Sequence, residues 1–97
     1  MIKSFGDETT VDVFDGTNSK ASRKFPQELH RKARRLLDLI NGAKVLHDLA
    51  VPPGNGLEAL KKDLKGFHSI RINIQYRIIF RWVESDAEAV RILDYHP

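Results

Sequence analysis

The chain has no cysteine, a single tryptophan and no long apolar run. The absence of cysteine excludes a disulfide framework and a thiolate metal site. The absence of an apolar run of about 20 residues excludes a membrane-spanning helix from this sequence. Residues 1–8 turn acidic where a secretion signal would become apolar, so we expect a cytoplasmic protein without a membrane partner.

The positive charge of the chain is concentrated in two blocks, although the net charge is only +3. Residues 20–35 contain seven Lys or Arg against one Glu, and residues 60–82 contain six against one Asp. Two such blocks favour a polyanionic partner, RNA or DNA. The alternative is that each block is a solvated face without a specific partner. The length and the 41% hydrophobic content indicate one folded domain over 1–97.

The first half of the sequence predicts one short strand and then helices. Residues 1–5 alternate as a strand does, residues 7–14 are a weak helix candidate, and we expect 6–24 to be partly mobile. The main helix prediction is 26–40, because Pro26 suits a first helical turn and apolar residues recur at helical spacing. These apolar residues are Leu29, Ala33, Leu36, Leu37 and Ile40.

A short helix over 43–49 and a proline-rich loop over 51–56 follow. From residue 57 onward the hydrophobic period falls towards two, which predicts strands over 66–72, 75–83 and 88–95. Within 75–83 the alternation assigns side chains to two faces. Ile78, Phe80 and Trp82 are predicted to face the helices, and Arg77, Ile79 and Arg81 to face the other way.

The element order predicts an α+β fold. An antiparallel sheet, made of the N-terminal strand and a C-terminal three-stranded meander, would carry two to three helices on one face. We expect its other face to be open and lined with arginine.

Three titratable side chains, Asp94, Tyr95 and His96, end the last predicted strand. Arg71 and Arg77 flank the predicted hairpin turn and would lie nearly opposite each other if that turn is tight. Guanidinium groups bind phosphate oxygens as a bidentate fork, and an imidazole carries protons near neutral pH. We therefore interpret these residues as a phosphodiester site. In it, Asp94 orients His96, and Tyr95 stacks on a base or takes a proton.

Each of these side chains also has an ordinary structural interpretation. A terminal Tyr–His pair is often a packing pair, and a strand arginine often binds a surface carboxylate. His30 and His47 lie in predicted helices and are interpreted as surface groups. His68 is either a site residue or a packing partner across the strands. The sequence has no glycine-rich phosphate loop, metal-binding pair or nucleophile elbow.

The proline-rich loop, the arginine hairpin and the terminal triplet together resemble a known family. The sequence is similar to the HigB/GraT-type killer proteins of the RelE/ParE toxin superfamily, from bacterial toxin–antitoxin systems. The similarity covers residues 2–5, Phe14, Gly16, 46–49, 52–60, 66–73, 75–78, Phe80, Trp82 and 94–96. The three features form a specific pattern in combination, whereas none of them is specific alone.

The resemblance implies a RelE-like fold and an endoribonuclease that cuts mRNA in the ribosomal A site without a metal or cofactor. It assigns catalysis to Asp94, Tyr95 and His96, and phosphate contact and site support to Arg71 and Arg77. We expect the basic blocks to bind ribosomal RNA and mRNA. The RNA-binding side chains would be Lys62, Lys65, His68, Arg81, Arg31, Lys32, Arg34 and Arg35. The implied partners are the ribosome and a helix-turn-helix antitoxin (HigA/GraA-like), through which alone the toxin would reach operator DNA.

The sequence departs from the family in the loop before the hairpin. Some members carry a catalytic His and Lys there, where this chain has Pro52, Pro53 and Asn55. The sequence therefore leaves three candidates for the second proton-transfer group: Lys62, Lys65 and His68. Related branches often have Gly-Asp-Arg where residues 62–64 are Lys-Asp-Leu.

Two other functions are open on the same fold. A non-nucleolytic inhibitor, like the gyrase-directed ParE toxins, would damage DNA without cutting mRNA, and the intact terminal triplet argues against it. A ribosome- or RNA-binding module would associate with ribosomes without toxicity.

Overall fold

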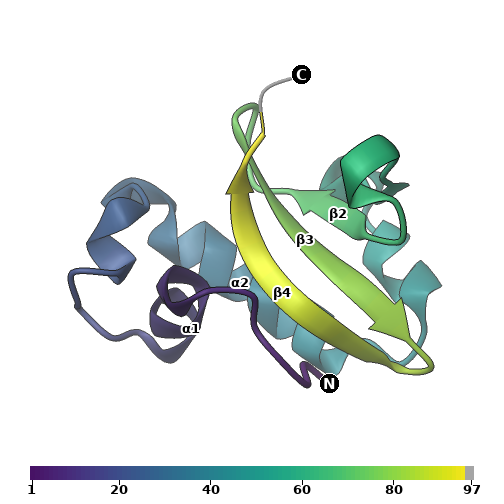
Figure 1. Ribbon diagram of the computed structural model, residues 1–97, viewed down its shortest axis with the longest axis horizontal. Helices are drawn as coiled ribbons and strands as arrows, with labels where there is room; N and C mark the ends of the chain where they lie inside the picture. The colour runs from purple at the N-terminus through teal and green to yellow at the C-terminus, as the bar shows by residue number, and fades with distance from the viewer. Residues whose placement is uncertain (96–97) are drawn as a thin grey trace.

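The computed structural model describes residues 1–95 and contains an antiparallel four-stranded sheet in the order β1-β2-β3-β4. The strands are β1 (Glu58–Ala59), β2 (His68–Arg71), β3 (Tyr76–Val83) and β4 (Asp86–Asp94). The helices α1 (Glu8–Asp15) and α2 (His30–Gly42) lie beside and behind the sheet (Figure 1), which confirms the predicted α+β architecture. Short 3-10 turns connect these elements: η1 (Ser22–Lys24), η2 (Gln27–Leu29), η3 (Leu46–Ala50), η4 (Pro53–Asn55) and η5 (Lys62–Leu64). None of the helices within residues 1–95 combines the length and the apolar character needed to cross a membrane.

The weakly predicted first helix is present as α1 because both of its ends are capped. The Asp7 carboxylate accepts the Thr10 backbone N–H at 2.9 Å, and Gly16 ends the helix in the left-handed conformation, with φ of 75°. The Thr10 hydroxyl accepts the Ile92 N–H at 2.9 Å, which attaches α1 to β4. Mobility of residues 6–24 stays a prediction.

The main helix starts four residues later than predicted. Pro26 precedes the 3-10 turn η2, and α2 begins only at His30. The interpretation of His30 as a surface group is wrong: the ring is buried, Nε2 lies 2.8 Å from the Phe25 carbonyl oxygen, and the two rings stack. His47 is exposed, as expected.

The predicted apolar stripe of α2 packs against the sheet and forms the core. Ala33, Leu36, Leu37 and Ile40 are almost fully buried, while Leu29 is partly buried at its edge. The sheet supplies Ile70, Ile72, Ile78, Phe80, Ala87 and Val90 to the same cluster, and Trp82 packs against it. The predicted helix-facing side of β3 is therefore confirmed.

The N-terminal segment runs beside β4 but is not the regular strand that was predicted. Two isolated parallel bridges join Ile2 to Ala87 and Phe5 to Val90. Between these bridges, Ala89 adopts a left-handed backbone with φ of 53° and donates its N–H to the Ser4 hydroxyl at 2.9 Å. This kink in β4 interrupts the ladder, so the segment pairs only at its two ends.

The second face of the sheet is not the open arginine surface that was predicted. Ile79 is fully buried and Leu60 is 8% exposed, yet neither belongs to the main core cluster. Arg77, on the same face of β3 as Ile79, is also buried. The segment that carries β1 and η5 lies over part of this face (Figure 1). The sequence did not reveal it because β1 has only two residues and no hydrophobic alternation.

The proline-rich loop is fixed by one buried amide. The Asn55 side chain donates to the carbonyl oxygens of Leu49 and Val51, each at 3.2 Å. Ahead of the loop, the helix predicted over 43–49 is instead the 3-10 turn η3, which starts at Leu46. The Asp48 carboxylate accepts the backbone N–H groups of Lys44 and Val45, and these hydrogen bonds lower the pKa of Asp48.

We predict that Asn55→Ala lowers the free energy of unfolding by about 1–3 kcal/mol, because it leaves two loop carbonyls without their donor. Chemical denaturation would measure the change. Asn18→Ala is the matched control, since Asn18 is exposed and accepts a hydrogen bond from the exposed Arg23, and it should change stability by less than about 0.5 kcal/mol. Equal effects of the two substitutions would contradict this role of Asn55.

Candidate active site

Arg71 and Arg77 lie directly opposite each other across the β2–β3 hairpin, as the sequence predicted. The hairpin turn is tight: the N–H groups of Ile72 and Asn73 both donate to the Tyr76 carbonyl, at 2.9 and 3.2 Å. The two arginines differ in environment, because Arg77 is 8% exposed whereas Arg71 is open to solvent. The site therefore contains one fixed and one accessible guanidinium.

The buried guanidinium of Arg77 is held by three segments. Nη1 donates to the Gly56 carbonyl oxygen at 3.1 Å and to the Ser69 hydroxyl at 2.8 Å. Nη2 lies 3.4 Å from a carboxylate oxygen of Glu58, whose side chain is 46% exposed. Both terminal nitrogens of the guanidinium group, Nη1 and Nη2, are thus partnered, as a buried charge requires.

Gly56 allows the proline-rich loop to approach the arginines. Its backbone is left-handed, with φ of 62°, a conformation that is strained for residues with a Cβ. A Cβ at this position would also lie 3.6 Å from Arg71 Cβ and 3.7 Å from Arg77 Nη2. Glycine therefore lets the loop present its carbonyl oxygen to Arg77.

Tyr95 is brought to the arginines by the end of β4. Its N–H donates to the Gln75 carbonyl at 2.7 Å, and Cζ of Arg77 lies 5.5 Å from the centre of the Tyr95 ring. Asp94 pairs with Tyr76, which packs against the core, so the register directs Asp94 to the opposite side from Arg77. The Asp94 carboxylate accepts a hydrogen bond from the Gln75 amide at 3.2 Å. The predicted role of His96 lies outside the described residues.

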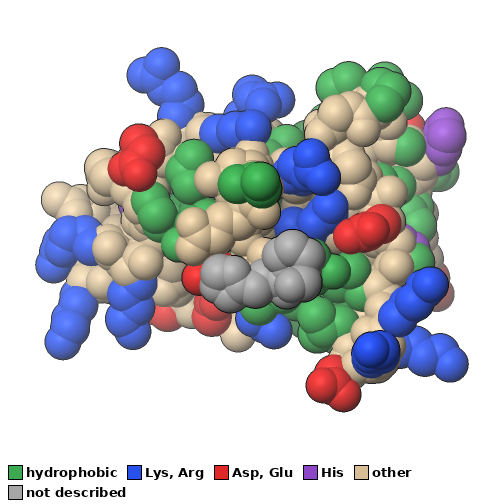
Figure 2. All heavy atoms as spheres, turned by 90° about the horizontal axis from the view of Figure 1, so that it is seen from above, with side chains coloured by type: hydrophobic (Ala, Val, Ile, Leu, Met, Phe, Trp, Pro, Cys, Tyr) green, Lys and Arg blue, Asp and Glu red, His purple; other side chains and the backbone are tan. Residues whose placement is uncertain are grey.

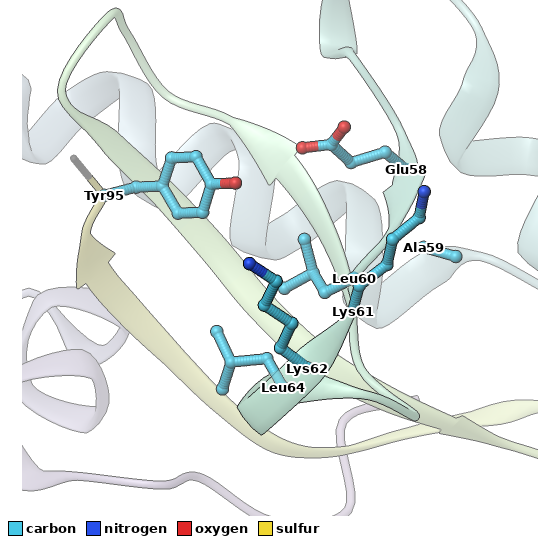
Figure 3. A pocket seen from close by; sticks show the side chains of 7 residues that line it. All are labelled: Glu58, Ala59, Leu60, Lys61, Lys62, Leu64 and Tyr95. Atoms are coloured by element: carbon cyan, nitrogen blue, oxygen red, sulfur yellow. The ribbon is translucent and has the colours of Figure 1, made fainter. Parts of the chain in front are cut away.

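A hollow of about 410 Å³ opens between Tyr95 and the segment that carries β1 and η5. The Tyr95 hydroxyl and the Lys62 ammonium group point into it from opposite sides, and the Glu58 carboxylate lies at its rim (Figure 3). Lys62 has a left-handed backbone, with φ of 56°, which costs a non-glycine residue conformational energy. Lys62 stands beside the aromatic ring of the site, whereas Lys65, at the end of η5, is not among the residues that line the hollow.

His68 is not part of this site. It pairs with Phe80 and stacks on its ring, with centroids 6.3 Å apart, so it faces the helix side of the sheet. Its Nδ1 atom is buried and has no hydrogen-bond partner among residues 1–95. The alternative interpretation of His68 as a cross-strand packing partner is confirmed, and RNA binding by its side chain stays a prediction.

The other predicted RNA-binding cations occupy different surroundings. The Arg81 guanidinium stacks on Phe67, with Cζ 4.3 Å from the ring centre. On α2, Arg34 Nε donates to the Val13 carbonyl oxygen at 3.1 Å and ties the two helices together. Lys32 and Arg35 line a second hollow together with Arg71, and Arg31 is exposed.

Sequence reasoning missed the groups that hold Arg77. Gly56 and Glu58 lie within residues 52–60, which resemble the family. The sequence did not predict that this segment contacts the hairpin. Ser69 carried a usable signal, because it is two residues from Arg71 and therefore on the same face of β2. Alternation likewise places His68 with the buried Ile70.

We predict that Arg77→Ala lowers the free energy of unfolding by about 2 kcal/mol, because buried Ser69 loses its partner and the Gly56 loop its anchor. Arg71→Ala should change stability by less than about 0.5 kcal/mol, because Arg71 is exposed. Urea unfolding of both variants measures the difference. A stable Arg77→Ala variant would refute the anchoring role.

Comparison with known proteins identifies the family. A family model described as the RelE-like toxin of the type II toxin–antitoxin system HigB matches residues 3–96. Toxin HigB-1 of Vibrio cholerae is 41% identical over 87 residues, which cover 90% of each chain.

Two solved structures share the fold. The YoeB-YefM complex from Staphylococcus aureus aligns with a TM-score of 0.60 and 16% identity, over 100% of this chain and 99% of that chain. The YoeB/ParE toxin from Agrobacterium tumefaciens aligns with a TM-score of 0.55 and 16% identity, over 98% and 100%. The sequence and structural matches agree: this chain belongs to the HigB family of RelE-like toxins of type II toxin–antitoxin systems.

Proposed function

We propose that the protein cleaves mRNA on the ribosome by attack of the RNA's own 2′-hydroxyl on the neighbouring phosphorus. Ribosome-dependent mRNA cleavage is the known kind of function for this family. The observation that carries the proposal is the opposed pair Arg71 and Arg77 beside Tyr95 on one face of the sheet. Two guanidinium groups facing each other repel one another, Glu58 offsets only part of that charge, and a bound phosphate would relieve the remaining repulsion.

Arg71 is the arginine that contacts the scissile phosphate. Its side chain is exposed, whereas the Arg77 guanidinium already donates to Gly56 and Ser69 and pairs with Glu58. Arg77 therefore supplies a fixed positive charge and helps to hold the site in place. Charge that develops on the phosphate oxygens in the transition state is stabilised by both groups.

The reaction needs one group to take the proton of the 2′-hydroxyl and another to protonate the leaving 5′-oxygen. The bond from phosphorus to the 5′-oxygen breaks as the bond to the 2′-oxygen forms, leaving a 2′,3′-cyclic phosphate. We assign proton transfer to His96, and base stacking or proton transfer to Tyr95, whose ring borders the hollow. Asp94, which the register directs away from Arg77, is assigned only to orient the C-terminal imidazole and not to contact the phosphate.

We assign to Lys62 the role of second proton-transfer group, which the sequence left open between three side chains. Its ammonium group points into the hollow opposite the Tyr95 hydroxyl (Figure 3). Lys65 lies at the exposed end of η5, and His68 lies on the other face of the sheet. Geometry thus favours Lys62 among the three groups that the sequence left open.

The partners follow from the proposed reaction. Cleavage on translating ribosomes takes place in the cytoplasm. Exposed cations such as Arg31 and Lys65 would then bind ribosomal RNA. A helix-turn-helix antitoxin of the HigA/GraA kind would neutralise the toxin, and operator DNA would be reached only through that complex. In support, two of the structures with this fold are complexes of YoeB with YefM.

We predict that Arg71→Ala slows cleavage of a translated mRNA by roughly 10²–10³-fold, because it removes one stabilising donor of the transition state. His96→Gln should abolish cleavage, because glutamine cannot exchange a proton at neutral pH. Primer extension in a purified translation system measures both, and growth arrest on expression should be relieved in parallel. Lys3→Ala, an exposed cation at the far end of the chain, is the control.

Folded Arg71→Ala and His96→Gln variants that still cut mRNA would contradict the proposal. DNA damage without mRNA cleavage would instead support a ParE-like inhibitor, and harmless ribosome association a binding module.

We predict that Lys62→Gly raises stability and lowers activity. Glycine adopts the left-handed backbone of this position freely, which should add about 1 kcal/mol to the free energy of unfolding. Loss of the ammonium group should slow mRNA cleavage at least tenfold, as expected when about one charge-assisted contact is removed. Thermal unfolding and the cleavage assay measure the two effects. An unchanged rate of mRNA cleavage in the Lys62→Gly variant would show that Lys62 is not part of the site.

A further inference from the structure

Two further hollows flank Arg71 and continue the site toward α2. The first, the tip hollow, has about 370 Å³ and is lined by Arg71, Asn73, Ile74, Arg77 and Tyr95. The second, the α2 hollow, has about 360 Å³ and lies between the N-terminal half of α2, the proline-rich loop and the hairpin turn. Its polar lining groups are Lys32, Arg35, Asn55, Arg71 and Asn73.

Neighbouring hollows share lining residues, from which we infer one path over all three. The tip hollow shares Arg71, Asn73 and Ile74 with the α2 hollow. It shares Tyr95 with the hollow that contains Lys62. The path therefore runs from α2, past the exposed side of Arg71, across the Tyr95 ring and on to η5. Each hollow has the size of a small ligand site, roughly 300–1,000 Å³.

The cations of α2 divide into two groups with respect to this path. Lys32 and Arg35 line the α2 hollow from one face of the helix. Arg34 is engaged with the Val13 carbonyl oxygen, on the side of α1. In the view onto the hairpin-turn end, Lys and Arg side chains gather near the centre beside apolar groups (Figure 2). The lining of the α2 hollow contains no Asp or Glu.

An apolar residue stands where the path bends around the hairpin. Ile74 is 92% exposed at the tip of the turn and lines both the tip and the α2 hollows. The turn is held by the Asn73 side chain, which accepts the N–H groups of Gln75 and Tyr76 at 2.9 and 2.7 Å. Ile74 and Tyr95 thus offer two surfaces against which unstacked bases can pack.

We propose that this path binds single-stranded RNA and that Lys32 and Arg35 bind the backbone phosphate next to the scissile one. The proposal rests on the proposed function, because it takes the Arg71–Arg77 pair as the point of cleavage. Alternating cations and base-stacking side chains suit a single strand, whereas a duplex hides its base faces. The α2 hollow then extends the site by one nucleotide, and these two cations act on the message rather than on ribosomal RNA.

The test measures binding without cleavage. A fluorescent 12-nucleotide RNA with 2′-O-methyl groups throughout cannot be cut, because its attacking hydroxyls are blocked. Its affinity is measured by anisotropy at several salt concentrations for the wild type and two double variants. Lys32→Gln with Arg35→Gln removes the cations of the α2 hollow. Lys3→Gln with Lys44→Gln removes the same charge from exposed positions outside both basic blocks, and is the matched control.

We expect the Lys32/Arg35 variant to bind at least tenfold more weakly than the control variant. The slope of log affinity against log salt should fall by about 0.7, as for one phosphate that is no longer neutralised on a single strand. Both variants should unfold like the wild type, since all four cations are exposed. Equal losses in the two variants, or no RNA binding by the wild type, would overturn the path. Undiminished RNA binding with lost antitoxin binding would also overturn it and assign the α2 hollow to a protein partner.

Failure of the path and failure of the proposed function give different results. If the wild type cuts translated mRNA but the two double variants bind RNA equally, the path is wrong and the function stands. If the Lys32/Arg35 variant alone loses RNA binding while the wild type cuts no mRNA, the path stands and the proposed function is wrong.

Discussion

The candidate site depends on the buried guanidinium of Arg77. A charge removed from water is costly unless it is paired and hydrogen-bonded. Here the partners come from the proline-rich loop, β1 and β2, through Gly56, Glu58 and Ser69. The Tyr95 ring, from the end of β4, lies against the same group. One side chain therefore joins segments that are distant in sequence and brings them to one place on the sheet.

The opposed arginines are unfavourable in isolation, since like charges directly across two strands destabilise the pair. Glu58 offsets part of the charge on Arg77, while Arg71 remains in water. The fold thus tolerates a concentration of positive charge at the hairpin and leaves one guanidinium free to meet an anion. Lys62, held in a strained left-handed conformation beside Tyr95, adds to this concentration. Such strain is concentrated at functional sites in proteins.

The sequence predicted the parts of the molecule that depend on periodicity. The apolar stripe of α2, the hairpin and the opposition of Arg71 and Arg77 all follow from spacing alone. The β1 strand could not be predicted, because two residues carry no period and its pairing with β2 is set by the loop that Asn55 holds. The covered second face depends on that strand and was missed with it.

The positions of two histidines that were predicted wrongly or left open could have been inferred from the hydrophobic pattern. His68 has the same strand parity as Ile70, and His30 precedes Ala33 and Leu37 at helical spacing, so the pattern implied both the helix-facing ring of His68 and the buried ring of His30. The division of the α2 cations could not be inferred from the helix alone. It depends on α1, which engages Arg34, and on the hairpin turn, which faces Lys32 and Arg35. Tertiary contacts, rather than local sequence, decide which cations of a basic block are available to RNA.

A crystal structure of the protein with a short RNA, blocked by one 2′-O-methyl group at the cleavage position, would test the site most directly. We expect a phosphate oxygen about 2.7–2.9 Å from the Arg71 guanidinium, with the adjoining base against Tyr95. RNA bound elsewhere, with Arg71 and Arg77 both left in contact only with solvent and protein, would contradict the phosphodiester site.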